Sequence, residues 1–496
     1  MADYTTTVSG TGRDSLKRVL VAPLLVIAAP FVWLALILQR PTRLLLTYIW
    51  LLPVHVLVMT ILFGLLGAPA SVVRVIAAWK EISLLAVLSL LLIWTPTHRR
   101  SALRLTLPDI CAMLLLVQAA LYVVFPVGIS ESNLDLTGRL YGFRDSVFLT
   151  LIYFVGRLAP ISARDARRII KALALLGIVS GVVALIEWWV PTDAYVRLGL
   201  VRYYNDFLGI HFQVNPYVNP FGLPENFWAT IGSLQVRRAG SLHISSQAFA
   251  VSYLLTLPAI LYTLQTATSR RSRWRWSIGL AVCLVTLLMT ITRMTIFVCL
   301  LQLVIIGLLS RRLRRRILVA LAGMLVLVIA SLPLTGRFFL NTINLDEPST
   351  AGHIRAWTNS LQYFSQSPLV GHGLGTGGQT ARRLDAEITG DESQYFKLTG
   401  EMGLPGLLLY LGLAGGVLVA AYRGWRRERD PDWRGMYLVV CVAGIGIGLN
   451  ALVTGIYSVP FLTYVYWWLA GMAIQARAMA QRARETTSQR EEVAHA

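Results

Sequence analysis

The sequence predicts an all-α polytopic membrane protein with about 12 to 13 transmembrane helices and two long loops on the outer side of the membrane. Apolar stretches long enough to cross a bilayer as helices recur from residue 19 to residue 476. The 496 residues are 55% hydrophobic and only 14% charged. A soluble multidomain chain would instead show amphipathic helices and alternating strands, and these are scarce here.

The apolar stretches are separated by short clusters of basic residues, which orient the predicted helices. Basic loops resist translocation, so these clusters are expected on the cytoplasmic side, together with the tail from Arg477 onward. The net charge of +20 then reflects membrane topology, and no nucleic-acid partner is expected. The clusters occupy residues 39–43, 97–104, 163–168, 269–275, 311–316 and 423–429. The predicted spans occupy residues 19–38, 43–67, 74–94, 107–127, 145–160, 168–190, 246–266, 276–291, 294–309, 317–334, 404–422, 436–456 and 461–476.

The first predicted span disagrees with this orientation, because it would leave Arg13, Lys17 and Arg18 outside. We therefore favour 12 full crossings and a cytoplasmic N-terminus. The first apolar run is long and lacks a small-residue cleavage pattern, so we expect it to remain as an anchor. The expected parts are N-terminal transmembrane helices (1–190), an outer loop (191–245), helices with a turn at Arg293 (246–334), a large outer loop (335–403), C-terminal transmembrane helices (404–476) and a cytoplasmic tail (477–496).

Neither a metal site nor a disulfide framework is predicted. The four cysteines lie within apolar stretches and form no CxxC pair. The glycine-rich segment 371–378 lacks the GK[ST] ending of a phosphate loop. The aromatic segment within 191–245 fits stacking on sugar rings and an interfacial aromatic belt equally well.

Three arginines stand at the predicted outer boundary of the membrane. Arg237 and Arg238 precede the span at 246, and Arg293 lies between two short apolar runs. A lone arginine among apolar residues costs about 2.5 kcal/mol or more on insertion unless it faces a cavity or a partner. Arg293 is therefore a functional candidate, with a snorkelling residue at a tight turn as the alternative. Arg237 is expected to be a solvated loop charge, while both interpretations remain open for Arg238.

Two guanidinium groups at this boundary suit a lipid-linked diphosphate. Arginine stays charged and binds phosphate oxygens through two parallel hydrogen bonds. A departing diphosphate gains negative charge, so fixed arginines stabilise the transition state more than the ground state. A glycosyl transfer also needs a base for the acceptor hydroxyl. Glu392, beside Asp391 and just before the span at 404, is a candidate base; a solvated loop charge or a helix N-cap is the alternative for this acidic pair.

Four landmarks within about residues 140–420 together resemble the superfamily of O-antigen ligases and Wzy-type polymerases of bacterial polysaccharide synthesis. Arg238-Ala239-Gly240-Ser241 resembles its R-x-G-[ST] element, and Thr292-Arg293 its Ser-Arg pair. Residues 353–378 resemble its R-x-x-x-W…P-x-x-G-x-G-x-G stretch, although only one residue separates Arg355 from Trp357. Residues 392–410 resemble its H-N-x-Y-L…E-x-G-x-x-G element.

The last landmark departs from the family pattern. Glu392 stands where the ligases carry their proposed catalytic histidine, counting back from Glu401. A carboxylate can serve as the base, and the change favours a polymerase over a ligase. The resemblance implies Glu392 as the catalytic residue, and Arg238, Arg293 and Arg355 as ligands of the donor diphosphate. Asp391, His353 and Tyr395 are then supporting residues, and His372 is also assigned a supporting role.

The resemblance implies a glycosyltransferase of the C type, facing the outer side of the bacterial cytoplasmic (inner) membrane. It would polymerise undecaprenyl-diphosphate-linked repeat units into exopolysaccharide or O-antigen, with no cofactor and no metal. Its partners would be the lipid-linked glycan donor and acceptor, membrane lipid, and in the cell a flippase and a chain-length regulator. An O-antigen ligase that transfers polymer to lipid A core is the alternative within the family. A flippase for the same lipid is the alternative of another class, but the two halves of the chain do not match. Ionisable residues within the spans are also few, the main ones being Lys80, Glu81, Glu187 and Arg293.

Overall fold

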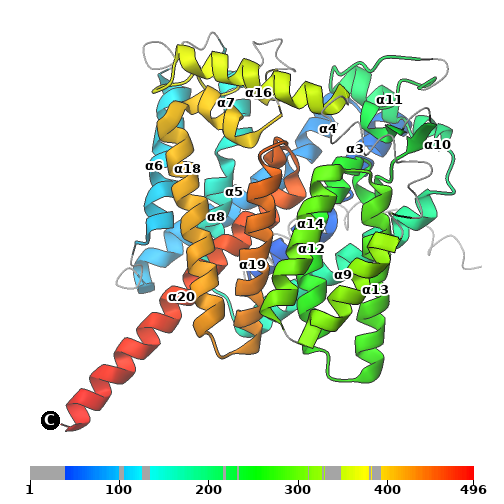
Figure 1. The fold of residues 1–496 in the computed structure, drawn as a ribbon. Helices are drawn as coiled ribbons and strands as arrows, with labels where there is room; N and C mark the ends of the chain where they lie inside the picture. Colours follow the sequence, from blue (N-terminus) through cyan, green and yellow to red (C-terminus); the bar gives the residue numbers. More distant parts are fainter. Residues whose placement is uncertain are drawn as a thin grey trace, which may run out of the picture.

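The protein is a bundle of helices with a small hairpin at one end (Figure 1). This computed structural model describes residues 40–99, 105–125, 134–215, 219–231, 234–310, 312–326, 329, 348–378, 381 and 392–495. The N-terminal helices are α2 (Thr42–Leu51), α3 (His55–Thr60), α4 (Ala70–Ala77), α5 (Trp79–Arg99), α6 (Leu107–Val124), α7 (Leu136–Ser146), α8 (Phe148–Leu158) and α9 (Ala163–Glu187). A π-helical turn, η1 (Ile61–Leu65), continues α3.

The second half of the chain begins with short elements and ends with long helices. The short elements are α10 (Asp193–Arg197), α11 (Leu200–Arg202), η3 (Tyr203–Phe207), η4 (Glu225–Phe227), strands β1 (Trp228–Ile231) and β2 (Leu234–Arg237), and η5 (Ser241–His243). The later helices are α12 (Ser246–Thr266), α13 (Arg270–Met289), α14 (Arg293–Leu309), α16 (Pro348–Gln366), α18 (Gln394–Arg427), α19 (Pro431–Asn450), η6 (Ile456–Ser458) and α20 (Pro460–His495).

The helical polytopic class predicted from the sequence is confirmed, although fewer helices than predicted have the length of a crossing in the part of the chain that the structure describes. In the described ranges five helices are long and apolar enough to cross a membrane, or up to seven if each of two bent pairs is one span. The predicted span 43–67 is one such pair, bent by 64° between α2 and α3. The apolar helices α8 and α14 have only 11 and 17 residues. The predicted span 19–38 lies outside the described residues.

The helices of the bundle approach each other most closely at glycines, which have no side chain to separate the backbones. Helix α20 crosses α8 at Gly156 and Gly471, and a Cβ at Gly156 would lie 2.1 Å from the carbonyl oxygen of Trp468. Such small-residue contacts let helix backbones approach in a membrane, where van der Waals packing drives association. Helix α12 is the centre of the second half, because it contacts α9, α13, α14 and α19.

The two ends of the bundle differ in character. Helix α16 lies across the top in Figure 1, near α7 and above the main helices, while the α12–α13 and α18–α19 connections lie at the bottom. Arginines flank both bottom connections, in residues 270–275 at the start of α13 and in residues 423–429 around the end of α18. This grouping follows the orientation expected from the basic clusters, in which α16 belongs to the outer side.

Two predicted boundaries differ from the observed elements. The span expected to begin at residue 404 belongs to α18, which begins at Gln394 and is interrupted at Gly403, where φ is 66°. The segment 191–245, predicted to be an outer loop, contains the antiparallel hairpin β1–β2, with Trp228 opposite Arg237, so the chain is not entirely helical. Four-residue strands next to an aromatic-rich coil give no clear alternation in the sequence, and the hairpin was therefore not expected.

Candidate active site

A buried carboxylate holds the segment from Arg238 to Ser241. Glu187, at the end of α9, accepts hydrogen bonds from the backbone N–H groups of Gly240 (3.1 Å) and Ser241 (2.6 Å). It also accepts one from the Tyr195 hydroxyl (2.6 Å). Bonds from two backbone amides to one carboxylate are charge-assisted and restrict the turn to one conformation. The sequence presented Glu187 only as an ionisable residue inside a span.

Arg237 completes this support from the other side. Its guanidinium lies 3.4 Å from Glu187 and 5.3 Å from the centre of the Tyr195 ring, and its side chain is only 12% exposed. The expectation that Arg237 is a solvated loop charge is therefore wrong. The sequence could not show the ion pair, because its partner lies 50 residues earlier in the chain.

The Arg238 segment docks on the turn that joins α13 to α14. The Arg238 Nε donates to the carbonyl of Thr290 (2.8 Å), and its Nη2 donates to the Thr292 hydroxyl (2.8 Å). The backbone N–H of Ala239 donates to the carbonyl of Met289 (3.1 Å). These bonds connect the two arginine-bearing turns rigidly, since each is made to backbone or to a short side chain.

Both turns contain strained backbone. Three non-glycine residues have positive φ in the part of the chain that the structure describes: Ser241 (53°), Ile244 (61°) and Ile291 (51°). All three flank the joined turns, and a β-branched residue such as isoleucine is an outlier there. Strain of about 1–3 kcal/mol per residue persists only where the surroundings impose it, and it is concentrated at functional sites.

The joined turns bring Arg238 and Arg293 within electrostatic range of each other. Burial, and then the positive charge of Arg293, lower the pKa of Arg238 to about 10. Both side chains remain partly accessible. Two like charges held together in a half-buried site favour an anionic ligand, because the anion relieves their repulsion. Of the three arginines predicted to bind the donor diphosphate, the structure thus brings together Arg238 and Arg293.

Glu392 lies just before α18 and contacts His353 from α16. The histidine Nδ1 lies against a carboxylate oxygen of Glu392, and the two side chains are 32% and 37% exposed, respectively. Ser393 is the N-cap of α18, so Glu392 does not cap that helix. His353 thus lies against the residue that stands at the family's histidine position in the sequence. Asp391, its sequence neighbour, lies outside the described residues.

The end of α19 connects Glu392 to Arg293. Next to Glu392, the Ser393 hydroxyl donates to the carbonyl of Ala451 (3.2 Å). The preceding residue, Asn450, donates from its side chain to the hydroxyl of Thr295 (2.9 Å), in the first turn of α14. The candidate base and the arginine pair thus stand at the same end of the bundle, joined by buried hydrogen bonds.

A second buried carboxylate shapes the glycine-rich loop. Glu401 is fully buried and accepts hydrogen bonds from Ser146 and from the backbone N–H groups of Gly375 (3.2 Å) and Gly377 (3.3 Å). Gly375 has a φ of 90°, and it meets Gly142 of α7 so closely that a Cβ at Gly142 would lie 2.1 Å from its nitrogen. The loop therefore acts as a structural element that seats α7, and His372 within it bonds to the backbone.

The two remaining candidates, Arg355 and Tyr395, form hydrogen bonds with backbone carbonyl groups. Arg355 is exposed on α16, and its Nε donates to the carbonyl of Ala351 in the same helix (3.3 Å). This contact does not join Arg355 to the Arg238–Arg293 pair. The Tyr395 hydroxyl donates to the carbonyl of Gly448 (2.7 Å), which fastens α18 to α19.

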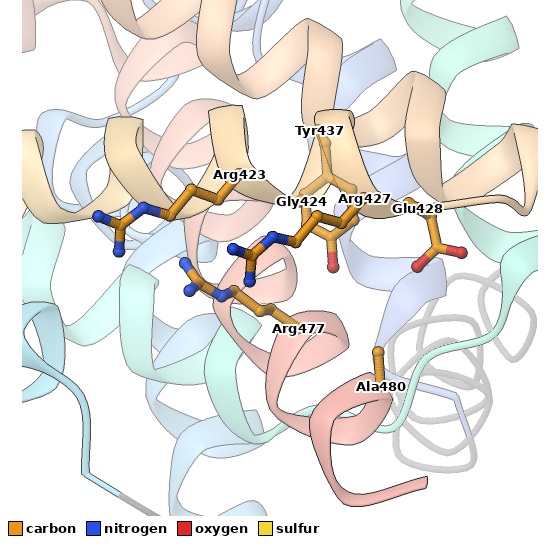
Figure 2. Close-up of a pocket in the computed structure, with 7 residues that line it drawn as sticks. All are labelled: Arg423, Gly424, Arg427, Glu428, Tyr437, Arg477 and Ala480. Carbon is orange, nitrogen blue, oxygen red and sulfur yellow. The ribbon is translucent and has the colours of Figure 1, made fainter. Parts of the chain in front are cut away.

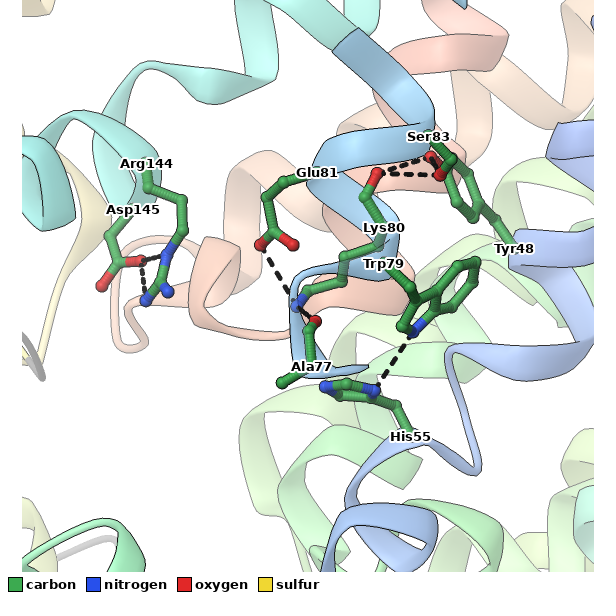
Figure 3. Close-up of polar contacts among 9 residues, drawn as sticks. All are labelled: Tyr48, His55, Ala77, Trp79, Lys80, Glu81, Ser83, Arg144 and Asp145. Atoms are coloured by element: carbon green, nitrogen blue, oxygen red, sulfur yellow. Dashed lines mark hydrogen bonds and ion pairs between the residues drawn. The ribbon is translucent and has the colours of Figure 1, made fainter. Parts of the chain in front are cut away.

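Four charged side chains from α5 and α7 form a second polar group, which the sequence indicated only in part (Figure 3). Lys80 and Glu81, at the bend between α4 and α5, form one ion pair of 3.1 Å. Arg144 and Asp145, at the end of α7, form another of 2.9 Å, and the two pairs lie within electrostatic range. The sequence indicated Lys80 and Glu81 as ionisable residues within a span, but it did not single out Arg144 and Asp145. Burial of charge in balanced pairs limits its cost.

Among the described residues, no group of three or more His, Cys, Asp or Glu side chains could hold a metal ion. No curated protein matches the chain. The sequence model of the O-antigen ligase family matches residues 278–411, which include Arg293, His353, Glu392 and Glu401. Enzymes of this family transfer glycans from lipid-linked substrates in membranes. The protein is therefore a multi-pass membrane protein whose residues 278–411 are similar to the O-antigen ligase family.

Proposed function

We propose that the protein is a polysaccharide polymerase that joins undecaprenyl-diphosphate-linked repeat units on the outer face of the bacterial cytoplasmic membrane. The observation that carries the proposal is the docking of the Arg238 turn on the α13–α14 turn, which pairs Arg238 with Arg293 beside the end of α19. The fork geometry of two guanidinium groups suits the oxygens of a diphosphate.

In this mechanism Glu392 is the general base. Its carboxylate takes the proton of an acceptor sugar hydroxyl as that oxygen forms a bond to the anomeric carbon of the donor. The bond from the anomeric carbon to the diphosphate oxygen breaks, and the diphosphate leaves with the electron pair. Arg238 and Arg293 stabilise the charge that develops on it. His353, in contact with Glu392, orients the carboxylate.

The test compares Glu392→Gln with Asp391→Asn in membranes supplied with lipid-linked repeat units. Glutamine keeps the size of the side chain but cannot accept the proton, so the transfer rate should fall by about two to four orders of magnitude while donor binding persists. Asp391→Asn should transfer at close to the normal rate. Polymer length on a gel, at matched protein levels, is the measurement. Normal polymer from Glu392→Gln would disprove the role of Glu392.

An O-antigen ligase is the second candidate, and the position of His353 favours it. A ligase of this family is thought to use a histidine as base, and His353 stands against Glu392. The two functions differ in product, because a ligase moves finished polymer to lipid A core whereas a polymerase lengthens the chain on its lipid carrier. Supplying both acceptors and identifying the labelled product distinguishes them. A flippase would move the lipid without making a new glycosidic bond.

A further inference from the structure

Three arginines from two helices converge at the end of the bundle opposite α16 (Figure 2). Arg423 and Arg427 lie one turn apart near the end of α18, and Arg477 faces them from α20. They line one pocket with Gly424, Glu428, Tyr437 and Ala480. Residues four apart on a helix share a face, so α18 presents both of its guanidinium groups to the same space.

The wall of this pocket is built by close packing. A Cβ at Gly424 would lie 2.7 Å from the ring of Tyr437, so the missing side chain lets the α19 tyrosine pack against α18. Gly424 stands between the two α18 arginines in the sequence, and the ring of Tyr437 supports the pocket beside them. The pocket is therefore a fixed feature of three packed helices.

The positive charge in the pocket is not balanced by the one carboxylate that lines it. Glu428 instead accepts hydrogen bonds from the backbone N–H groups of Arg429 (2.8 Å) and Asp430 (3.0 Å) at the α18–α19 connection. Burial, and then the charges of Arg423 and Arg427, lower the pKa of Arg477. Within the described ranges, no ion pair of the three arginines is found.

We propose that this pocket is a binding site for a phosphate-class anion at the cytoplasmic boundary of the membrane. Three guanidinium groups provide forked donors for the oxygens of one phosphate, which would also relieve their mutual repulsion. The anion is either the phosphodiester headgroup of an acidic phospholipid or free inorganic phosphate. The rings of Tyr422 and Trp425, 6.1 Å apart beside the site, are of the kind found at headgroup depth.

The site is separate from the proposed glycan transfer. Occupancy by a lipid headgroup would tie the end of α18 to the middle of α20. Helix α18 also carries the Glu401 carboxylate that shapes the glycine-rich loop. The proposal does not depend on the identity of the enzyme's substrate.

The test uses the full-length protein in nanodiscs of phosphatidylcholine, with or without phosphatidylglycerol, and measures the lipid that remains bound by native mass spectrometry. Arg423→Gln, Arg427→Gln and Arg477→Gln should each lower retention of phosphatidylglycerol about tenfold, since each removes one charge-assisted contact. Arg426→Gln is the matched control, because Arg426 lies on the same turn but contacts Tyr422 instead of the pocket. Size-exclusion chromatography checks that every variant is folded.

A second arm adds inorganic phosphate to the protein in pure phosphatidylcholine and follows its thermal stability. Stabilisation by phosphate that is lost in Arg477→Gln, without selective retention of phosphatidylglycerol, supports the site and assigns it to the free anion. The proposal is overturned if neither anion is preferred by the unmodified protein. It is also overturned if Arg426→Gln loses as much binding as Arg427→Gln, because the arginines would then act only as a general positive surface.

Discussion

Replacing Glu187 by glutamine should disturb the Arg238–Arg293 pair, although Glu187 contacts neither of these two side chains. The carboxylate of Glu187 accepts from the N–H groups of Gly240 and Ser241, and from Tyr195 on its other oxygen. A glutamine keeps one accepting oxygen, and its NH₂ group then faces donors. If the NH₂ group faces the two backbone amides, both lose their acceptor; if it faces Tyr195, the hydroxyl must turn from donor to acceptor.

The cost can be worked out from these contacts. A buried donor left without a partner costs about 1–3 kcal/mol. Removing one member of a buried ion pair costs about 3–5 kcal/mol, and Arg237, 12% exposed, loses its counter-charge. Because the two costs overlap, we expect Glu187→Gln to destabilise the protein by about 3–5 kcal/mol.

Thermal unfolding of the purified protein in detergent is the measurement, with binding of donor lipid as the second readout. Both Tm and donor affinity should fall, because Arg238 loses the turn that positions it. Asp193→Asn is the matched control, since Asp193 pairs with the exposed Arg197 and such surface pairs contribute about 0–1 kcal/mol. The double variant Glu187→Gln/Arg237→Gln should be less destabilised than the sum of its single changes, because no charge is left unpaired.

Two results would refute this reasoning. The first is a Glu187→Gln variant that melts like the unmodified protein. The second is strict additivity of Glu187→Gln and Arg237→Gln, which would mean that the two side chains do not interact in the folded state.

Four further outcomes are expected. Arg293→Lys keeps the charge but loses the fork, so polymer yield should fall sharply at normal protein abundance; full activity would leave Arg293 as a snorkelling residue. Donor binding should weaken as pH rises through about 10, because Arg238 then loses its proton in the free protein, and a binding curve flat across this range would contradict its role. Gly142→Ala should lower Tm, since its Cβ would meet the backbone of the glycine-rich loop at 2.1 Å; an unchanged Tm would show that α7 is not seated there. A cysteine at the exposed Asn215 should react with an impermeant thiol reagent from outside, whereas one at the exposed Arg271 should not, and the reverse pattern would invert the topology.

The membrane class could be predicted from the sequence, and the candidate residues could be selected from it, because both depend on local properties. Apolar runs of bilayer length identify helices whatever their neighbours are, and clusters of arginine indicate orientation. The short spacing within Arg238-Ala239-Gly240-Ser241 and Thr292-Arg293 marked both turns for the same reason. Glu392 was selected because it is acidic and lies just before the predicted span at 404, and the family resemblance placed it at the histidine position.

The shape of the site was decided only by tertiary packing. No local pattern shows that Glu187 holds the Arg238 turn, or that Arg237 is an ion-pair partner instead of a loop charge. The contact of His353 with Glu392 joins segments whose connection the sequence leaves open. In lipid, apolar faces are almost interchangeable, so a hydrophobic pattern shows that helices form but not which faces meet. The close approaches at glycines and the buried hydrogen bonds select those faces, and they place two distant arginines beside each other.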